Sequence, residues 1–412
     1  MRVRPFPALR PAPELAARVA APPYDVVTRA EAAALAAANP LSFLHVSRAE
    51  IDLPGQIDPY DPRVYARARD NLDRLVERGA LLREPRPSLY LYRAVRQGRA
   101  QTGVVGCVHV DDYESGVIRK HETTRPDKED DRTRHILALG AHPEPVLLAH
   151  RALGELRQLA EQDAQAPPLY DVSTPAGVRH TLWRVAEPGR YTELFTQVPV
   201  AYVADGHHRS ASAWRAARER RPGRGTAGRE LESDWFPAVL FPAEELQILP
   251  YNRLIADLGG QSPGELLARL AAVGRLTPTE DPVPRRPGSF CLYLAGRWYR
   301  LELDDASIDR RDPVRSLEIG LLQERVLGPV LGIADQRTDR RIDFVGGIHG
   351  AGELARRVDS GAAALAVSLR PTTMAELMAV ADAGQIMPPK STWFEPKLLS
   401  GLFIHVLDSR HA

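Results

Sequence analysis

The chain has 412 residues, of which 44% are apolar and 26% charged, a composition typical of a globular protein with more than one domain. The formal net charge of +1 provides no strong field toward nucleic acid or an anionic membrane. No apolar run reaches the roughly 20 residues that cross a bilayer, and the two cysteines show no pairing pattern, so we expect a cytoplasmic protein without disulfides.

The N-terminal part of the sequence predicts helices joined by extended loops. One helix is expected over residues 12–20, and another opens at Thr28, which forms a capping box with Glu31. Between them, residues 21–26 predict a rigid extended loop, because a residue before proline avoids the helical region. Further along, the pattern predicts a helix over residues 63–79 and strands over 88–94 and 103–110.

The most charged segment spans residues 119–134 and holds six basic and five acidic residues. Pro126 is expected to interrupt any continuous helix there. Glu122 follows an apolar step, where a strand could present it to a cleft, and it could then act as general base to a hydroxyl or as a magnesium ligand. Arg125 and Lys128 could reach phosphates. The alternative interpretation is a solvated surface segment.

The most informative motif is Asp205-Gly206-His207-His208-Arg209. It follows the apolar run 198–204, which predicts a buried strand, and precedes residues 210–218, which predict a helix. Free backbone N–H groups and the positive end of the helix dipole meet at such a junction, which makes it an anion site. Two imidazoles and a guanidinium add donors suited to phosphate. A capped helix with solvated histidines and a zinc site are the alternatives, although no cysteine or HxxxH partner is nearby.

The remaining pattern mixes helices and strands without a regular βαβ repeat, which favours an α+β fold. The character of the sequence changes near residues 250–262, and we predict domains over residues 1–250 and 251–412. Capping boxes are expected at Ser262 with Glu265 and at Thr373 with Glu376. Strands are predicted over residues 146–150, 178–185, 235–241, 289–294 and 297–303, and helices over 153–164, 314–327 and 373–383.

The C-terminal segment 387–397 is predicted to be a loop. One interpretation is an ordered loop with two buried aromatic side chains. The other is an active-site lid that brings Lys390 or Lys397 over a ligand.

The motif at residues 205–209 resembles the phosphate-binding signature of the ParB/sulfiredoxin superfamily, in particular the DGHHR of SerK-type free serine kinases. The wider pattern is similar to a bacterial family of unknown function related to these kinases. It includes residues 21–25, His121-Glu122, Thr124-Arg125-Pro126, Tyr251-Asn252-Arg253 and residues 387–394. The resemblance implies a ParB/sulfiredoxin-like mixed core with additional N-terminal elements and a C-terminal α+β domain.

The resemblance also implies a nucleotide-dependent kinase that phosphorylates the hydroxyl of a small substrate. Free L-serine is the first choice, with O-phospho-L-serine as product. ATP or ADP is the expected donor, and magnesium the expected metal, with Glu122 or Asp205 as its candidate ligands. A non-catalytic nucleotide-binding switch of the ParB type and a phosphohydrolase are the alternatives. The expected partner is a small-molecule substrate, a hydroxy amino acid, and we expect binding to neither nucleic acid nor a membrane. The sequence does not predict the oligomeric state.

The same resemblance assigns roles to particular residues. Glu122 is the expected catalytic carboxylate, with His121 and Asp205 beside it. The expected phosphate-binding residues are Gly206, His207, His208, Arg209, Arg125, Lys128 and Lys390.

Overall fold

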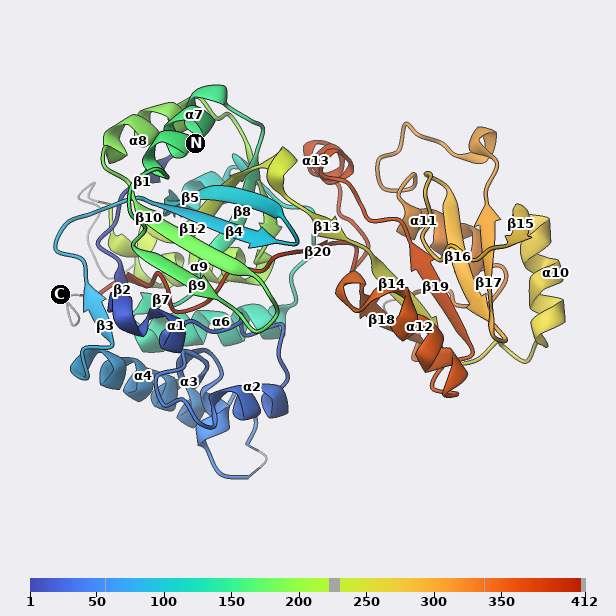
Figure 1. Cartoon of the computed structure of the whole chain (residues 1–412), viewed down its shortest axis with the longest axis horizontal. Coiled ribbons are helices and arrows are strands. Elements are labelled where there is room, and N and C mark those ends of the chain that lie inside the picture. The colour runs from blue at the N-terminus through green and yellow to red at the C-terminus, as the bar shows by residue number, and fades with distance from the viewer. Residues whose placement is uncertain (56, 222–229, 337, 409–412) are drawn as a thin grey trace. The chain divides into compact units, whose positions relative to one another are not determined.

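The computed structural model describes residues 1–55, 57–221, 230–336 and 338–408, and the chain forms two compact units (Figure 1). The first comprises Met1–Leu246 and the C-terminal segment from Pro396, and the second comprises Gln247–Glu395. Whereas the sequence assigned the whole C-terminus to the second domain, the chain returns to the first unit at Pro396. Each unit mixes helices and strands, which confirms the α+β class. No helix among the described residues is both long and apolar enough to cross a membrane.

A nine-stranded mixed sheet forms the centre of the first unit, in the order β6-β11-β8-β12-β5-β4-β10-β9, with β1 also paired to β5. The pairs β6–β11 and β8–β12 are parallel, and the other neighbours are antiparallel. The strands are β1 (Val3–Arg4), β4 (Tyr90–Arg96), β5 (Arg99–His109), β6 (Ile118–Arg119), β8 (Val146–His150), β9 (Tyr170–Ser173), β10 (Arg179–Arg184), β11 (Ala201–Asp205) and β12 (Trp235–Pro242).

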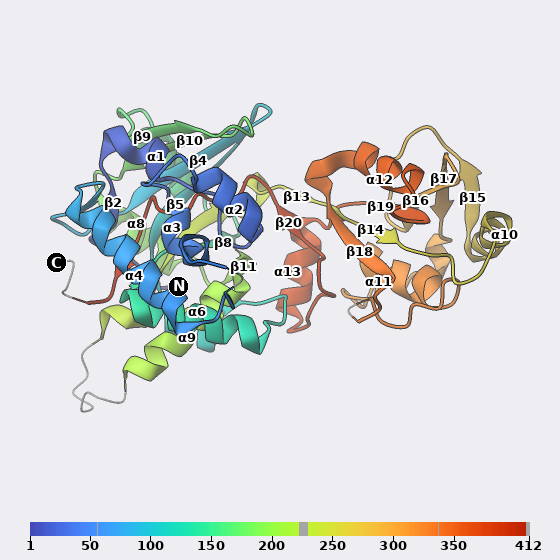
Figure 2. The ribbon, with the colours of Figure 1, turned by 90° about the horizontal axis from the view of Figure 1, so that it is seen from below.

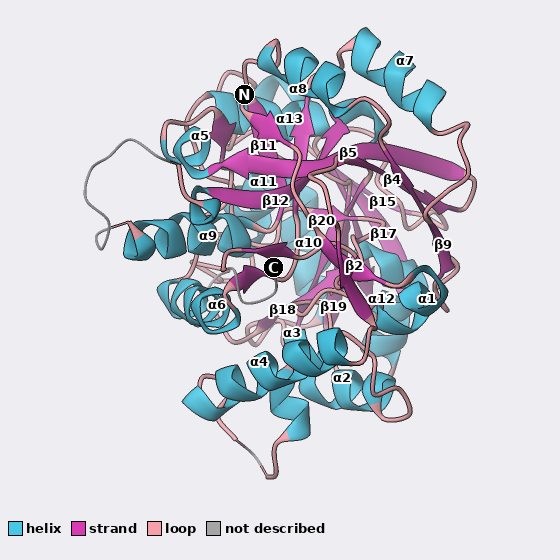
Figure 3. Ribbon diagram, turned by 90° about the vertical axis from the view of Figure 1, so that its left-hand side faces the viewer, coloured by secondary structure: helices cyan, strands magenta, loops and turns pink. Residues whose placement is uncertain are grey.

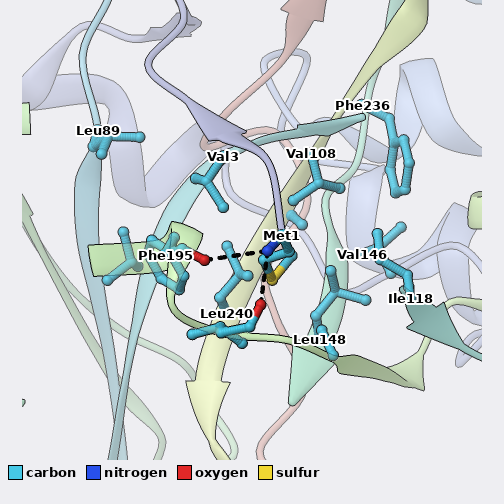
Figure 4. Packing of buried hydrophobic residues seen from close by; sticks show 14 of the residues in the cluster. Met1, Val3, Leu89, Val108, Ile118, Val146, Leu148, Phe195, Phe236 and Leu240 are labelled. Atoms are coloured by element: carbon cyan, nitrogen blue, oxygen red, sulfur yellow. Dashed lines mark hydrogen bonds between the residues drawn. The ribbon is translucent and has the colours of Figure 1, made fainter. Parts of the chain in front are cut away.

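The N-terminal residue is part of the core of this sheet. The Met1 ammonium donates to the carbonyl oxygens of Phe195, at 3.3 Å, and Val198, at 2.7 Å (Figure 4). These carbonyls lie at the end of α8 (Pro188–Thr196), where the helix dipole favours a cation. The side chains of Val108 and Leu240 belong to the same buried cluster, so the first strand is fixed by both packing and charge.

Helices pack around this sheet, and two of them bear on the predicted site. α6 (Pro126–Leu139) and α9 (His207–Arg220) lie side by side (Figure 3), and α4 (Pro62–Glu77) packs on α6. The other helices are α1 (Ala16–Val19), α2 (Arg29–Ala36), α3 (Leu44–Ser47), α5 (Val110–Glu114) and α7 (Gly154–Asp163). Two small sheets pair β2 (Leu9–Pro11) with β3 (Leu81–Arg83) and β7 (Ala141–His142) with β21 (His405–Val406).

The second unit is built on a six-stranded antiparallel sheet in the order β15-β17-β16-β19-β14-β18. Its strands are β14 (Tyr251–Ile255), β15 (Arg275–Pro278), β16 (Ser289–Leu294), β17 (Arg297–Glu302), β18 (Ile342–Gly346) and β19 (Leu365–Leu369). Its helices are α10 (Pro263–Val273), α11 (Glu318–Leu322), α12 (Gly350–Asp359) and α13 (Met374–Asp382). A separate pair joins β13 (Ile248–Leu249) to β20 (Trp393–Phe394).

Local sequence signals predicted several of the longer elements, including α4, α9, α10 and β5. The capping boxes at Thr28, Ser262 and Thr373 are all formed. The strands predicted over residues 289–294 and 297–303 pair as a hairpin that turns at Ala295 and Gly296, both with positive φ. The expected helix over 314–327 is shorter: α11 continues as a π-helix over Gln323–Leu327. Pro126 interrupts the helical pattern of the charged segment, as predicted: residues 119–125 are not helical, and α6 begins at Pro126, because the first turn needs no N–H from this position.

Candidate functional site

The predicted anion site lies where β11 ends and α9 begins. Gly206 joins the two in the left-handed region, with φ 98° and ψ 36°, which side chains rarely adopt. A Cβ there would lie 3.0 Å from Nε of Arg209, so glycine also lets the guanidinium fold over the turn. No side chain caps α9, and the first N–H groups of a helix have no acceptor within it. These donors are therefore suited to an anion.

The start of a second helix lies beside this turn. The N–H of Arg125, which precedes α6, donates to Nε2 of His208 at 3.1 Å. Farther along, the hydroxyl of Ser212 donates to the carbonyl of Glu129 at 3.1 Å, so α6 and α9 run in the same direction (Figure 2). The positive ends of two helix dipoles thus lie together, an arrangement that a bound anion would stabilise.

Asp205, the last residue of β11, is held by two cations. Its Oδ1 accepts a hydrogen bond from Lys397 Nζ at 2.8 Å, and its Oδ2 accepts one from Arg209 at 2.6 Å. Burial acts to raise the pKa of Asp205, but the charges of Lys397 and Arg209 outweigh it and hold the pKa below its ordinary value. The carboxylate is therefore ionised, with each oxygen engaged by a cation.

Arg209 is buried, and its guanidinium forms hydrogen bonds with other groups of the protein. Besides Asp205 it donates to the carbonyl of Pro145, while its Nε has no hydrogen-bond partner among the described residues. Burial acts to lower its pKa, but the charges of Asp205, Asp25 and Glu144 raise it overall. Arg209 is therefore a permanent charge behind the turn, and two of its five N–H donors bond to Pro145 and Asp205.

A small cavity lies next to Arg209. Its volume is about 20 Å³, and its polar lining includes Arg132, His142 and Glu144. Glu144 accepts a hydrogen bond from the hydroxyl of Ser400 at 2.6 Å, and burial raises its pKa. A space of this volume has room for about one water molecule. The cavity is therefore too small to hold a nucleotide.

The two histidines of the motif point to different neighbours. His208 accepts the N–H of Arg125, whereas Nδ1 of His207 lies 3.8 Å from a carboxylate oxygen of Glu122. The backbone N–H of His121 donates to Nε2 of His207 at 3.4 Å. Burial lowers the pKa of both His207 and His208, so these rings are neutral near pH 7. They do not form the cationic pair that would attract phosphate most strongly.

His121, Glu122 and His207 form a cluster from two segments distant in the sequence. One ligand atom from each residue lies within 4.8 Å of the other two, and the imidazole rings of His121 and His207 meet edge to face at 4.4 Å. His121 is 1% exposed, and neither of its ring nitrogens has a hydrogen-bond partner among the described residues. Burial lowers the pKa of His121 to about 4. The carboxylate of Glu122 remains partly exposed and so accessible to a substrate.

The predicted phosphate-binding cations at the start of α6 lie at the surface. Arg125 is exposed and pairs with Asp127 at 2.7 Å. The ammonium of Lys128 lies 5.2 Å from the centre of the Tyr60 ring. Neither cation is buried in an ion pair, so both could turn toward a ligand at the adjacent helix ends.

Lys390 belongs to the other unit. Its ammonium lies 5.4 Å from the centre of the Tyr251 ring, its carbonyl accepts a hydrogen bond from Arg253, and its φ of 57° is left-handed. Of the two lysines considered for a lid, Lys397 is the one bonded to the motif. No local sequence signal links Lys397 to Asp205, because 192 positions separate them.

Tyr24 and Arg132 are further residues near the motif. Tyr24 is buried under the guanidinium of Arg132, which lies 4.3 Å from its ring centre. The neighbouring Asp25 is exposed, and its charge acts on Arg209 and His208. The sequence drew attention to residues 21–25 but assigned them no role. The structure brings them to the same region as the motif.

Comparison with solved structures gives distant likenesses. A variant of a free serine kinase in complex with AMP has 13% identity, a TM-score of 0.35, and coverage of 70% of this chain and 87% of its own. A conserved hypothetical protein from Pyrococcus furiosus has 15% identity, a TM-score of 0.33, and coverage of 71% and 91%. C-terminally truncated SbnI from Staphylococcus aureus has 15% identity, a TM-score of 0.38, and coverage of 72% and 85%.

Comparison at the level of sequence is more decisive. No curated protein matches the chain. One family model does match, over residues 3–319, and this range includes both the cluster at residues 121–122 and the motif at 205–209. The sequence-based expectation of a family of unknown function is thereby confirmed: the chain belongs to the family described as "Protein of unknown function (DUF1015)".

Proposed function

We propose that this protein is a nucleotide-dependent kinase that transfers a terminal phosphate to the hydroxyl of a small substrate, with free L-serine as the preferred acceptor. The observation that carries the proposal is the adjacent start of two parallel helices, α6 and α9, beside the partly exposed carboxylate of Glu122. Helix ends of this kind bind phosphate, and a carboxylate within reach can accept a hydroxyl proton. The resemblance of residues 205–209 to the free serine kinase signature supports the same class.

In the proposed reaction the hydroxyl oxygen attacks the terminal phosphorus of ATP or ADP. The bond from that phosphorus to the bridging oxygen breaks, and the shortened nucleotide leaves with the electron pair. Glu122 accepts the hydroxyl proton and releases it to water. The backbone of Gly206, His207, His208 and Arg209 would hold the phosphates. Catalysis would then rest on positioning and on neutralising charge.

The remaining site residues have supporting roles in this proposal. Arg125 and Lys128 would offset charge on the transferred group. Asp205 would hold Arg209 and Lys397 in place, since its two oxygens bind these cations. Lys390 stays a prediction as a phosphate ligand, because the contacts described for it lie within residues 247–395.

Magnesium would supply shielding of the phosphate charges when it is bound with the nucleotide. Glu122 is a better candidate ligand than Asp205, because both oxygens of Asp205 already accept hydrogen bonds from cations. We also propose that the sheet and helices around the motif are the ParB/sulfiredoxin-like core that the sequence resemblance implies.

The direct test incubates the full chain with magnesium, L-serine and either ATP or ADP, and follows O-phosphoserine by mass spectrometry. The Glu122→Gln variant should lose at least about a hundredfold in rate, the usual contribution of a positioned general base. Its nucleotide affinity, measured by calorimetry, should change little. Glu77→Gln is the matched control, because Glu77 is an exposed residue at the end of α4.

Three results would contradict the proposal. Nucleotide binding without turnover on any hydroxy amino acid would indicate a switch. Release of inorganic phosphate without a phosphorylated acceptor would indicate a phosphohydrolase. Undiminished transfer by Glu122→Gln would remove this carboxylate from the mechanism.

A further inference from the structure

The cluster of His121, Glu122 and His207 is placed by the topology of the first sheet. β6 and β11 are parallel neighbours, with Ile118 opposite Ala201. Parallel strands end at the same edge of a sheet, so the residues that follow them emerge together. His121 and Glu122 follow β6, and His207 follows β11 after the turn at Gly206. The meeting of these side chains is therefore a consequence of strand order.

Within the part of the chain that the structure describes, the ring nitrogens of His121 lack the hydrogen-bond partners that buried polar atoms normally have. Both ring nitrogens of His121 are without a hydrogen-bond partner among the described residues, although the side chain is 1% exposed. Buried polar atoms in proteins are nearly always satisfied, and exceptions call for a missing water, ion or ligand. The contact from the His121 N–H to Nε2 of His207 is 3.4 Å, which is long for a hydrogen bond. Nε2 of His207 accepts this backbone N–H, so a ligand at Nδ1 requires the ring proton to move to Nε2 and this long contact to open.

The donor set favours one class of ligand. Two neutral imidazoles and one carboxylate suit divalent transition metals such as zinc, manganese, iron or cobalt, whereas magnesium prefers oxygen ligands alone. The ligand atoms lie up to 4.8 Å apart, so they must approach one another around an ion with metal–nitrogen distances of about 2 Å. The partly exposed Glu122 side chain can make much of that adjustment.

We propose that His121, Glu122 and His207 bind one divalent transition-metal ion, with its open coordination positions toward the starts of α6 and α9. Binding of the ion does not depend on the kinase proposal. Its use in the reaction, contacting a phosphate oxygen, does rest on that function. Because a carboxylate has two oxygens, Glu122 can bind the ion through one and accept a proton at the other.

Sequence spacing could not reveal this site. The adjacent histidines of the motif suggest a shared ligand, yet only His207 faces the cluster, while His208 accepts the N–H of Arg125. The partner imidazole comes from His121, 86 positions away. This difference between neighbouring histidines also provides a matched control.

The test uses the purified full chain, stripped with a chelator and titrated with cobalt(II), followed by its visible absorption and by calorimetry. We expect one equivalent to bind, with absorption bands of cobalt in a nitrogen-containing site. His121→Gln and His207→Gln should each weaken binding by at least about tenfold, whereas His208→Gln should keep wild-type affinity. An excess of magnesium should not displace the cobalt. Circular dichroism and thermal melting identify any variant that fails to fold.

Two outcomes would overturn the metal site: no stoichiometric cobalt binding by the wild type, or the same loss in His208→Gln as in the folded His121→Gln and His207→Gln variants. Failure of the kinase proposal looks different. In that case cobalt binds with the expected pattern, but no acceptor is phosphorylated with either cobalt or magnesium present.

Discussion

Each unit of the molecule contains a buried arginine, and the two are accommodated in different ways. In the first unit, Arg209 bonds to Asp205 at 2.6 Å, and Asp25 and Glu144 also act on its charge. These acids outweigh the effect of burial and raise the pKa of Arg209. The charge of Arg209 is thus matched by more than one carboxylate, in a region where two helix ends are also positive.

Arg253 of β14, in the second unit, is 0% exposed, and the hydrogen-bond acceptors described for it are neutral. It donates to Oε1 of Gln336 at 3.1 and 3.0 Å, and to the carbonyls of Tyr251 and Lys390. Its guanidinium also lies 4.5 Å from the centre of the Phe344 ring. Burial lowers the pKa of Arg253.

The difference indicates two uses of the same side chain. Arg209 is part of an ionic network around the motif, so its removal leaves buried acids without their cation. Arg253 organises backbone carbonyls by hydrogen bonding, and its charge has no matching acid among these partners. The comparison therefore predicts unequal effects when each arginine is replaced by methionine.

Arg209→Met should have the largest effect. The substitution leaves the carboxylates of Asp205 and Glu144 without the buried guanidinium, and breaking a buried pair in this way costs about 3–5 kcal/mol. Hydrogen exchange read on peptides from β11 measures the local free energy of opening. Arg63→Met is the control, because Arg63 forms an exposed pair with Asp61 and should change stability by less than about 0.5 kcal/mol. A loss below about 1 kcal/mol for Arg209→Met would show that the acids do not need this cation.

Arg253→Met should have a smaller effect. It leaves neutral acceptors unsatisfied, chiefly Oε1 of Gln336, which costs about 1–3 kcal/mol, and it leaves no buried acid unpaired among them. Hydrogen exchange on peptides from β14 gives the value for this unit. A destabilisation equal to or larger than that of Arg209→Met would end the distinction between the two arginines.

Local chemistry made the turn at Gly206 predictable. An apolar run, a glycine and an alanine-rich segment specify a strand, a left-handed turn and a helix within a few residues. The capping boxes are equally local, since their two hydrogen-bonding residues lie three positions apart. The α+β class was predicted from the mixture of helices and strands without a regular βαβ repeat.

The non-local contacts could not be predicted. The bond from Lys397 to Asp205 and the approach of His121 to His207 depend on how the chain returns to the first unit and on which strands pair. The helix α12, over Gly350–Asp359, was not predicted either. Its first turn contains Gly350 and Gly352, and glycine weakens the helical signal. Strand order is set by the whole core, and short windows of sequence do not contain it.

The third prediction concerns Asp205 and the dependence of the unfolding free energy on pH, where the expected effect is smaller than the losses predicted for the two arginine variants. Its pKa in the folded chain lies below the value of about 3.9 in an unfolded chain, because Lys397 and Arg209 oppose the effect of burial. The ionised group therefore contributes stability that is complete above the unfolded pKa and is lost as the pH falls through the folded pKa. Asp205→Asn removes this titration, so its unfolding free energy should fall less steeply with acid.

Between about pH 5 and pH 3 the wild type should lose about 1–2 kcal/mol more than Asp205→Asn does, measured by urea unfolding at each pH. The comparison uses slopes, because the variant also leaves Lys397 and Arg209 without their acid and is less stable at every pH. Asp70→Asn, at an exposed position of α4, should keep the wild-type slope. Equal slopes of unfolding free energy against pH for the wild type and Asp205→Asn would mean that Lys397 and Arg209 do not lower the pKa of this carboxyl group. Asp205 could then not be the acid that distinguishes the surroundings of Arg209 from those of Arg253.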